Sequence, residues 1–258
     1  MDYFDTPAAS YVRFMGRFSA PLATSFAELG LAGVDADARV LDVGCGPGML
    51  TAELALRRPE EQIAAVDPVA SFVAATAATY PAVDTQVAGA EDLPYESATF
   101  GATLAQLVVH FMSDPARGMR EMTRVTVPGG RVSACVWAHA EGIGPLSGFW
   151  HAVSRMDPDA DDESGLAGSA RGQLVALLED AGAREVTEEL LTVRVGFASF
   201  DDWWRPFTEG VGPAGAYVAG LDEAGRERLV GLLREEYGYG PFSVEASAWA
   251  ATGLVSPR

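Results

Sequence analysis

The order of apolar and polar residues over positions 38–137 predicts a sheet with helices packed against it. Short apolar runs predict strands at ARVLDV, QIAAVD, VDTQVAG, FGATLAQLVV and RVSACVW. Between them, apolar residues at helical spacing predict helices at PGMLTAELALRR, at residues 69–79 and at PARGMREMTRV, before which Asp114 is a suitable N-cap. Strands that alternate with helices, and that are too apolar to face water, predict a doubly wound, mostly parallel sheet.

The pattern is less regular on either side of this region. Residues 1–37 are predicted to form amphipathic helices. Further helices are predicted at GIGPLSGFWHAVSRM, ARGQLVALLEDAG, DDWWRPFTEGVG and LDEAGRERLVGLLREE, and two further strands at REVTEELLTVRVGF and PFSVEASAWAAT. The acidic stretch DPDADDES is interpreted as a charged, solvated loop. No linker rich in Pro or Ser divides the chain, so we expect one domain over residues 1–258.

Glycines are concentrated directly after the first predicted strand, in the stretch VLDVGCGPG. Glycine there permits positive φ angles and lets a ligand approach the backbone, at the sheet edge where open α/β sheets bind ligands. A P-loop would need Lys, which this chain lacks, and the third glycine comes too early for the dinucleotide pattern G-x-G-x-x-G. Asp67, at the end of the second strand, could accept hydrogen bonds from both hydroxyls of a ribose. The pattern predicts a nucleoside ligand with little negative charge.

Composition narrows the class of partner. The formal net charge is -18 and all 18 basic residues are arginines, so the surface is expected to repel nucleic acid. Cys45 and Cys135 lie in the glycine loop and in an apolar run, and we expect reduced, buried thiols in a cytoplasmic protein. We expect no signal peptide, membrane-spanning segment or metal site, because no run is apolar for long enough and the histidines lack ligand spacing.

Four motifs follow one another in order along the first half of the chain. They are the acid and glycines of residues 42–48, the second-strand acid Asp67, the segment AEDLP at residues 90–94, and LVVHFMSDPARGMREMTRVTVPGGRV. Together they resemble the class I S-adenosylmethionine-dependent methyltransferases, closely over about residues 8–138. The resemblance implies a Rossmann-like α/β fold with a seven-stranded sheet, S-adenosylmethionine as cofactor and S-adenosylhomocysteine as its product. It also implies a helical lid from residues 1–37, a cofactor-binding core over 38–138 and substrate-covering insertions within 139–258.

The same resemblance implies roles for residues of the glycine loop. Gly44 and Gly46 would let the backbone approach the methionine part of the cofactor, and Asp42 would orient the loop or reach the cofactor's amino group. Asp67 would hold the ribose, with Pro68 shaping the turn. The full set of predicted cofactor-binding residues is Arg17, Asp42, Val43, Gly44, Cys45, Gly46, Gly48, Asp67, Pro68, Ala90, Glu91 and Gln106.

Three of these assignments depend on details of this sequence. Gly89 stands where many relatives have an acid that reads the adenine amino group, so adenine recognition would rest on the backbone of Ala90 and on Glu91 or Asp92. Gln106, at the end of the fourth strand, is expected near the sulfonium. Arg17 would pair with the carboxylate of the cofactor, and a surface salt bridge is the alternative.

His110 is the candidate general base, because it follows the fourth strand on the carboxyl edge and relatives often have His there. Its alternative role is capping or packing before Asp114. The predicted substrate pocket contains Tyr11, Trp150, Trp203 and Phe207, and these rings could instead form the core between the insertions and the sheet. Trp203 and Trp204 are adjacent in a helix and point apart, so only one is expected to face the pocket.

We therefore predict a methyltransferase that moves a methyl group onto oxygen, nitrogen or carbon of a small organic molecule. The resemblance is to the branch of quinone-precursor methylases and natural-product tailoring enzymes. One alternative is a non-catalytic protein that binds S-adenosylmethionine or S-adenosylhomocysteine. An RNA methyltransferase is the other alternative, against which the net charge of -18 argues. The sequence does not distinguish a monomer from a homodimer.

Overall fold

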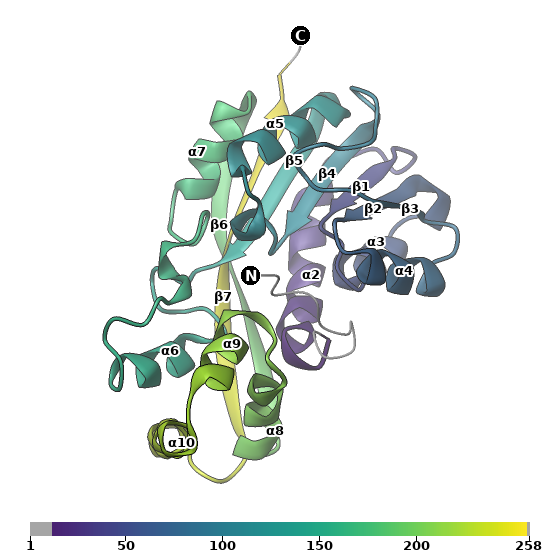
Figure 1. Cartoon of the computed structure of the whole chain (residues 1–258). Helices are drawn as coiled ribbons and strands as arrows, with labels where there is room; N and C mark the ends of the chain where they lie inside the picture. The colour runs from purple at the N-terminus through teal and green to yellow at the C-terminus, as the bar shows by residue number, and fades with distance from the viewer. Residues whose placement is uncertain (1–11, 257–258) are drawn as a thin grey trace.

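A seven-stranded sheet forms the centre of the computed structural model, which describes residues 12–256 (Figure 1). The strand order is β3-β2-β1-β4-β5-β7-β6. The strands are β1 (Val40–Val43), β2 (Ile63–Asp67), β3 (Asp84–Val87), β4 (Phe100–Gln106), β5 (Thr126–Trp137), β6 (Ala183–Phe197) and β7 (Phe242–Val255). The first five pair in parallel, and β7 is antiparallel to both β5 and β6. The predicted Rossmann-like, mostly parallel seven-stranded fold is confirmed.

Helices cover both faces of the sheet (Figure 1). On one face, α2 and α3 contribute Phe18, Leu22, Phe26, Leu50 and Leu54 to one buried cluster. On the other, α5 and α7 contribute residues such as Met119, Met122, Leu174 and Leu178 to a second cluster. The helices are α2 (Gly16–Leu31), α3 (Met49–Ala55), α4 (Ala70–Thr79), α5 (Pro115–Val125), α6 (Ser147–Ser154), α7 (Gln173–Asp180), α8 (Phe200–Trp204), α9 (Gly212–Gly220) and α10 (Glu223–Tyr237).

Local sequence explains where individual elements begin and end. Asp114 caps α5 as predicted, because its side chain accepts a hydrogen bond from Arg117 N at 2.9 Å, and Pro115 occupies the first turn. The predicted strand FGATLAQLVV is wrong beyond Gln106. Leu107 adopts a positive φ of 61°, which turns the chain into the short 3-10 helix η2 (Val109–Phe111).

The segments outside the core region lie in two places. Helix α2 packs against β4, β5, β6 and β7, and its residues Phe18, Leu22 and Phe26 are buried, so this helix belongs to the core. Helices α6, α8, α9 and α10 lie together beside the far ends of the long strands β6 and β7 (Figure 1). The predicted DDWWRPFTEGVG helix is divided into α8 and the 3-10 helix η4 (Arg205–Glu209), with Pro206 at the start of the second. The lid role of residues 1–37 stays a prediction, and residues 1–11 lie outside the described part.

Candidate functional site

The glycine loop follows β1 at the carboxyl edge of the sheet. Gly44 N and Cys45 N both donate hydrogen bonds to Val66 O of β2, at 2.7 and 2.9 Å. Gly44 has a φ of 73°, and a Cβ there would lie 2.4 Å from Val108 Cγ1, so only glycine fits. Gly46 also has a positive φ, of 53°, but a Cβ there would meet no atom within 4 Å. The loop therefore packs tightly at its first glycine and borders open space at its second.

Asp67, at the end of β2, holds this loop in place. Its Oδ2 accepts a hydrogen bond from Gly46 N at 2.9 Å, and its Oδ1 accepts one from Val69 N at 2.8 Å. Burial raises the pKa of this carboxyl, while the two backbone N–H donors act in the opposite direction. Each carboxylate oxygen retains acceptor capacity for one further donor, such as a sugar hydroxyl.

Asp42 lies beneath the loop and is almost fully buried. Thr51 Oγ1 donates a hydrogen bond to Asp42 Oδ2 at 2.6 Å, while Asp42 Oδ1 is buried without a hydrogen-bond partner. Burial raises the pKa of Asp42 to about 7, and the negative charge of Asp67 adds to this effect. The side chains of Val43 and Cys45 are buried, and burial raises the pKa of the Cys45 thiol, which makes it a poor nucleophile. Pro68 is exposed beside Asp67.

The segment predicted to contact adenine is anchored to the start of α5. Glu91 Oε1 accepts hydrogen bonds from the backbone N and the Oγ of Ser113, at 2.7 and 2.9 Å. Ala90 is buried against the cluster that contains Met119 and Met122. Glu91 therefore has protein partners already, and the roles of both residues toward adenine stay predictions.

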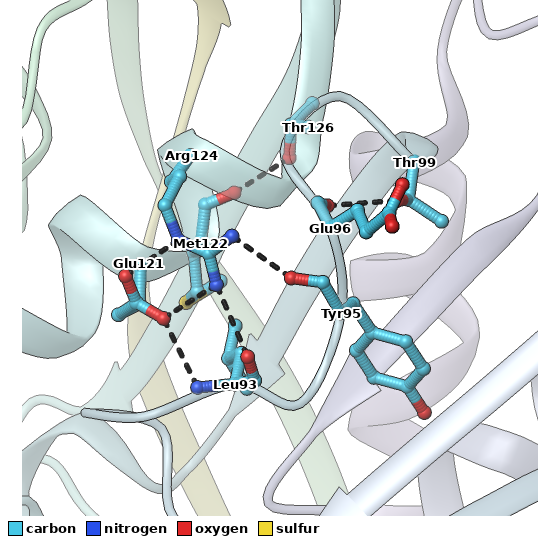
Figure 2. A network of polar contacts seen from close by, with 8 residues as sticks. All are labelled: Leu93, Tyr95, Glu96, Thr99, Glu121, Met122, Arg124 and Thr126. Atoms are coloured by element: carbon cyan, nitrogen blue, oxygen red, sulfur yellow. Dashed lines mark hydrogen bonds and ion pairs between the residues drawn. The ribbon is translucent and has the colours of Figure 1, made fainter.

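Arg124 of α5 fixes the chain that follows this segment (Figure 2). Its Nη1 donates to Tyr95 O at 2.8 Å and its Nη2 to Leu93 O at 3.0 Å. Glu121 completes the network, because it accepts from Leu93 N at 3.0 Å and from Arg124 at 2.7 Å. These contacts hold the loop between β3 and β4 against α5, and no sequence motif pointed to them.

Two further predicted cofactor residues point toward protein groups. Gln106 Nε2 donates to Ser19 O of α2 at 3.0 Å, and Gln106 Oε1 is buried without a partner. Arg17 donates to Asp202 Oδ1 at 3.0 Å and to Gly196 O at 2.8 Å, and its guanidinium stacks 4.2 Å from the centre of the Phe197 ring. The salt bridge left open by the sequence is thus present at Arg17, and cofactor roles for both residues stay predictions.

A pocket that is partly open to solvent lies beyond the carboxyl ends of β4 and β5, and its empty volume of about 490 Å³ includes part of that open solvent. Its apolar wall comes from widely separated parts of the chain. The described residues that line it are Phe14, Met15, Leu107, His110, Phe111, Trp137, His139, Leu146, Glu163, Val211, Gly212, Pro213 and Ala214. Because β1 and β4 are parallel neighbours, the glycine loop and this pocket lie at the same edge of the sheet.

His110 lines the pocket from η2. Its Nδ1 is buried without a hydrogen-bond partner, and its ring lies 3.9 Å from the Phe111 ring and 6.4 Å from the His139 ring. Burial lowers the pKa of His110 to about 3, and His139 adds to this effect. The imidazole is therefore uncharged at neutral pH and able to accept a hydrogen bond or a proton.

Three of the residues predicted for the substrate pocket, Trp150, Trp203 and Phe207, are not among those that line this cavity. Tyr11 lies outside the described residues. Trp150, Trp203 and Phe207 are buried in a cluster of rings that joins α6, α8 and η4, with Phe149 stacked on Phe207 at 4.9 Å. Trp203 is buried and Trp204 is partly exposed, as their opposite directions predicted. A direct role for these rings toward substrate stays a prediction.

The sequence reasoning missed most of the residues that do line the pocket. Phe14 and Met15 precede α2, and Val211 and Pro213 begin α9, so only tertiary packing brings them together. Glu163 lies in the stretch DPDADDES, which its composition indicated as a solvated loop, yet the side chain is buried. Within residues 12–256, no group of three or more His, Cys, Asp or Glu side chains is arranged to hold a metal ion. None of the helices described there has the length and apolarity of a membrane span.

Comparison with known proteins agrees with the fold and the order of the motifs. Residues 41–134 match the family model of a methyltransferase domain. Malonyl-(acyl-carrier protein) O-methyltransferase of Hahella chejuensis is 28% identical over 200 residues, which cover 72% of this chain and 70% of that protein. The Erwinia billingiae protein of the same name is 31% identical over 120 residues, 46% of this chain and 47% of the relative, so that match spans about half of each.

A solved structure supports the fold over the whole chain. The phosphoethanolamine N-methyltransferase 2 of Haemonchus contortus, in complex with phosphomonomethylethanolamine and S-adenosylhomocysteine, matches with a TM-score of 0.61 at 15% identity. The match covers 100% of this chain and 58% of that one. The methyltransferase domain matched at residues 41–134 and the fold of the chain agree with the resemblance to class I S-adenosylmethionine-dependent methyltransferases.

Proposed function

We propose that this protein transfers a methyl group from S-adenosylmethionine to oxygen, nitrogen or carbon of a small organic molecule. The observation that supports this most is the arrangement of two features at one sheet edge. Asp67 and the glycine loop border open space at Gly46, and the apolar pocket with His110 lies beyond the neighbouring strand. A nucleoside-sized group at the first and an acceptor in the second would bring a reactive carbon between them.

The residues of the loop fit S-adenosylmethionine. The open space beside Gly46 admits a ligand, and Asp67 offers acceptor capacity for the two ribose hydroxyls. Oδ1 of Asp42, in the strand before the loop, is buried without a hydrogen-bond partner and could accept one from a donor. The third glycine, Gly48, comes one residue too early for the dinucleotide pattern G-x-G-x-x-G, which argues against a dinucleotide in this loop.

When bound, S-adenosylmethionine supplies an electrophilic methyl carbon on a positively charged sulfur. The residues of this chain have three tasks: alignment of the acceptor, exclusion of water, and acceptance of the proton that an O–H or N–H acceptor loses. The apolar wall of the pocket serves the first two. His110 is placed for the third, and its low pKa of about 3 means that it is available as the free base but is a weak one. This favours acceptors that lose their proton late, as the new bond to carbon forms.

The acceptor named for the malonyl relatives is not carried over to this chain. The described lining of the pocket contains no Arg, and the chain has no Lys, so a carboxylate there would lack a cationic partner. The sequence matches to these relatives cover only part of each chain, so the relatives' acceptor is not assigned to this protein. We further propose a cytoplasmic location, which the free, buried Cys45 and Cys135 support. We also propose a single domain whose N-terminal and C-terminal segments cover the site.

Calorimetry with S-adenosylmethionine and S-adenosylhomocysteine tests the first half of the proposal, and we expect both to bind. A methyl-transfer assay with labelled S-adenosylmethionine over a panel of phenols, amines and activated carbon acids, with transfer RNA as a further arm, tests the second half. Label on a small molecule supports the proposal. Binding of either ligand without transfer to any member supports the non-catalytic alternative, and label on RNA alone supports the other.

A further inference from the structure

A buried carboxylate faces the pocket from a loop that belongs to no cofactor motif. Glu163 begins the 3-10 helix η3 (Glu163–Gly165), where Asp162 Oδ1 accepts a hydrogen bond from Ser164 N at 2.9 Å. The Glu163 side chain is only 7% exposed, and the residue lines the pocket. Its Oε2 accepts a hydrogen bond from Trp150 Nε1 at 2.9 Å. The indole thus holds one carboxylate oxygen from behind the pocket wall.

The other carboxylate oxygen has no hydrogen bond from the described residues. Its ion-pair partner is His139 Nε2, which lies 4.0 Å from Glu163 Oε1 and is therefore beyond hydrogen-bond distance. Burial lowers the pKa of His139, although Glu163 and Asp162 act against this, so the ring provides no full positive charge at neutral pH. Burying most of a carboxylate costs free energy when only one hydrogen-bond donor reaches it. A further donor at Oε1 would offset that cost.

The rest of the pocket restricts what can bring that donor. Apart from Glu163, His139 and His110, the described lining side chains are apolar or aromatic, and none is an arginine. Trp137 Nε1 lacks a partner, but it is enclosed in the wall, and a neutral N–H offsets little of the charge of a carboxylate or phosphate. The pocket therefore matches an apolar body with an O–H or N–H group and mismatches an anion.

We infer that Glu163 selects methyl acceptors that are non-anionic, largely apolar and equipped with a hydroxyl or amine that donates to its Oε1. His139, beside that oxygen, positions the donor, and Trp150 positions the carboxylate. Hydrogen bonds to ionised acceptors are roughly twice as strong as neutral pairs, so Glu163 discriminates between molecules of equal size. The inference depends on the proposed function only for the statement that the bound molecule is a methyl acceptor.

The test measures binding of four matched bicyclic probes to the protein in the presence of excess S-adenosylhomocysteine. The probes are 2-naphthol, 2-(aminomethyl)naphthalene, 2-methoxynaphthalene and 2-naphthoate. On the natural chain we expect at least one of the two donor probes to bind ten times more tightly than the methoxy and carboxylate probes. Preference for the amine alone identifies a cationic acceptor, and preference for naphthol identifies a hydroxyl acceptor. Equal binding of all four, or preference for naphthoate, overturns the inference before any variant is made.

Two variants then locate the preference. Glu163→Leu should abolish it, while Glu163→Gln, which keeps an acceptor for Trp150 but loses the charge, should abolish preference for the amine and reduce preference for naphthol. Glu141→Gln is the matched control, because Glu141 also accepts an indole N–H, from Trp249 at 3.0 Å, but is exposed and outside the pocket. The control should bind the probes with the same preference as the natural chain. If Glu163→Leu melts cooperatively and still shows that preference, the inference is wrong.

The design separates this inference from the proposed function. Calorimetry without probes reports whether S-adenosylhomocysteine binds, and the Glu163 variants should bind it as the natural chain does. If the nucleoside fails to bind while the probe preference disappears in Glu163→Leu, the proposed function is wrong and the selectivity of the pocket stands. If the nucleoside binds and the preference survives in Glu163→Leu, the inference is wrong and the proposed function stands.

Discussion

The two halves of the sheet edge use buried carboxylates in opposite ways. At the glycine loop, Asp67 accepts two hydrogen bonds from backbone N–H groups of neighbouring turns, so its charge serves the loop itself. In the pocket, the Glu163 carboxylate has one indole donor at Oε2 and no hydrogen bond from the described residues at Oε1. The first carboxylate fixes a backbone shape that suits one kind of ligand. The second carboxylate, we infer, accepts a hydrogen bond from a donor on a ligand.

This difference separates cofactor binding from substrate selection. The groups at the loop belong to two short stretches, residues 42–48 and Asp67, whereas the pocket is assembled from the start of α2, the ends of β4 and β5, η3 and α9. Substitutions in one half should therefore leave the other half nearly unchanged, because no hydrogen bond joins the two halves within residues 12–256. Each experiment below either breaks that separation or measures it more sharply.

The largest effect is expected at Asp67. Asp67→Ala removes the acceptor for Gly46 N and for the ribose, so affinity for S-adenosylhomocysteine should fall about 100-fold, equivalent to about 2.7 kcal/mol. Titration calorimetry measures this change. The control is Asp84→Ala, which removes a half-exposed carboxylate that pairs with Arg39 at 3.1 Å and should leave affinity intact. An unchanged affinity in Asp67→Ala would remove this residue from the nucleoside site.

Features formed by residues close together in the chain could be predicted from the sequence, whereas features formed by residues far apart could not. The strands, the loop and Asp67 were predictable because each depends on a short apolar run or on glycines at fixed spacing. The turn at Leu107 was not, since a leucine with φ of 61° is held by Leu107 N bonded to Cys135 O, a contact between separate strands.

The pocket shows the limit of composition as a guide. The acidic loop at residues 157–164 has the composition of a solvated segment, yet Glu163 is buried because Trp150 supplies a donor from the preceding helix. Trp150, Trp203 and Phe207 were predicted either to face substrate or to form a core, and the structure packs them among the rings of α6, α8 and η4. Their role toward substrate stays a prediction. Packing between helices decides which ring faces a cavity. The hydrophobic periodicity of a single helix carries no information about that packing.

The next effect is a pH dependence of stability at His110. Its pKa is about 3 in the folded protein against 6.5 for an ordinary histidine, so the unfolded chain takes up a proton that the folded chain does not. Stability from this residue is complete above pH 6.5 and is lost as pH falls toward 3. Between pH 6.5 and 5 the natural chain should lose about 1–2 kcal/mol more than His110→Gln.

Urea unfolding at pH 7.5 and pH 5.0 measures this difference. His151→Gln is the control, because His151 is exposed on α6 and the variant should follow the natural chain at both pH values. If His110→Gln loses as much stability as the natural chain on acidification, the histidine is charged in the fold and the description of it as a free base is wrong.

Trp150→Phe should destabilise the protein by about 1–2 kcal/mol, because it removes the only hydrogen bond that the described residues give to the Glu163 carboxylate. Trp249→Phe removes the same kind of bond to the exposed Glu141 and should cost about half as much or less. Thermal and urea unfolding of both variants compare the two. Equal losses would show that burial does not distinguish these carboxylates, and the contrast between pocket and surface would fail.

Gly46→Ala probes the open space at the loop. Alanine at a φ of 53° is strained, and its Cβ would enter the space that a nucleoside needs, so affinity for S-adenosylhomocysteine should fall about tenfold. Gly33→Ala introduces comparable strain, at a φ of 73° with no atom within 4 Å, far from the loop. Gly33→Ala should lose similar stability, about 1 kcal/mol, with no loss of affinity. A loss of affinity in both would mean that strain alone weakens binding.

The smallest effect is expected at Arg17, a predicted cofactor residue that pairs with Asp202 of α8. Its ion pair with Asp202 is about one-third exposed on each side, so removing it should cost less than 1 kcal/mol. A double-mutant cycle with Arg17→Met and Asp202→Asn measures this coupling by urea unfolding, and the same four proteins are titrated with S-adenosylhomocysteine. If Arg17 serves only the fold, Arg17→Met and Asp202→Asn bind the nucleoside as the natural chain does. If Arg17 leaves Asp202 to bind the ligand's carboxylate, Arg17→Met weakens binding while Asp202→Asn strengthens it, because the competing carboxylate is gone. That second outcome would join α2 and α8 to the cofactor site and end the separation of the two halves.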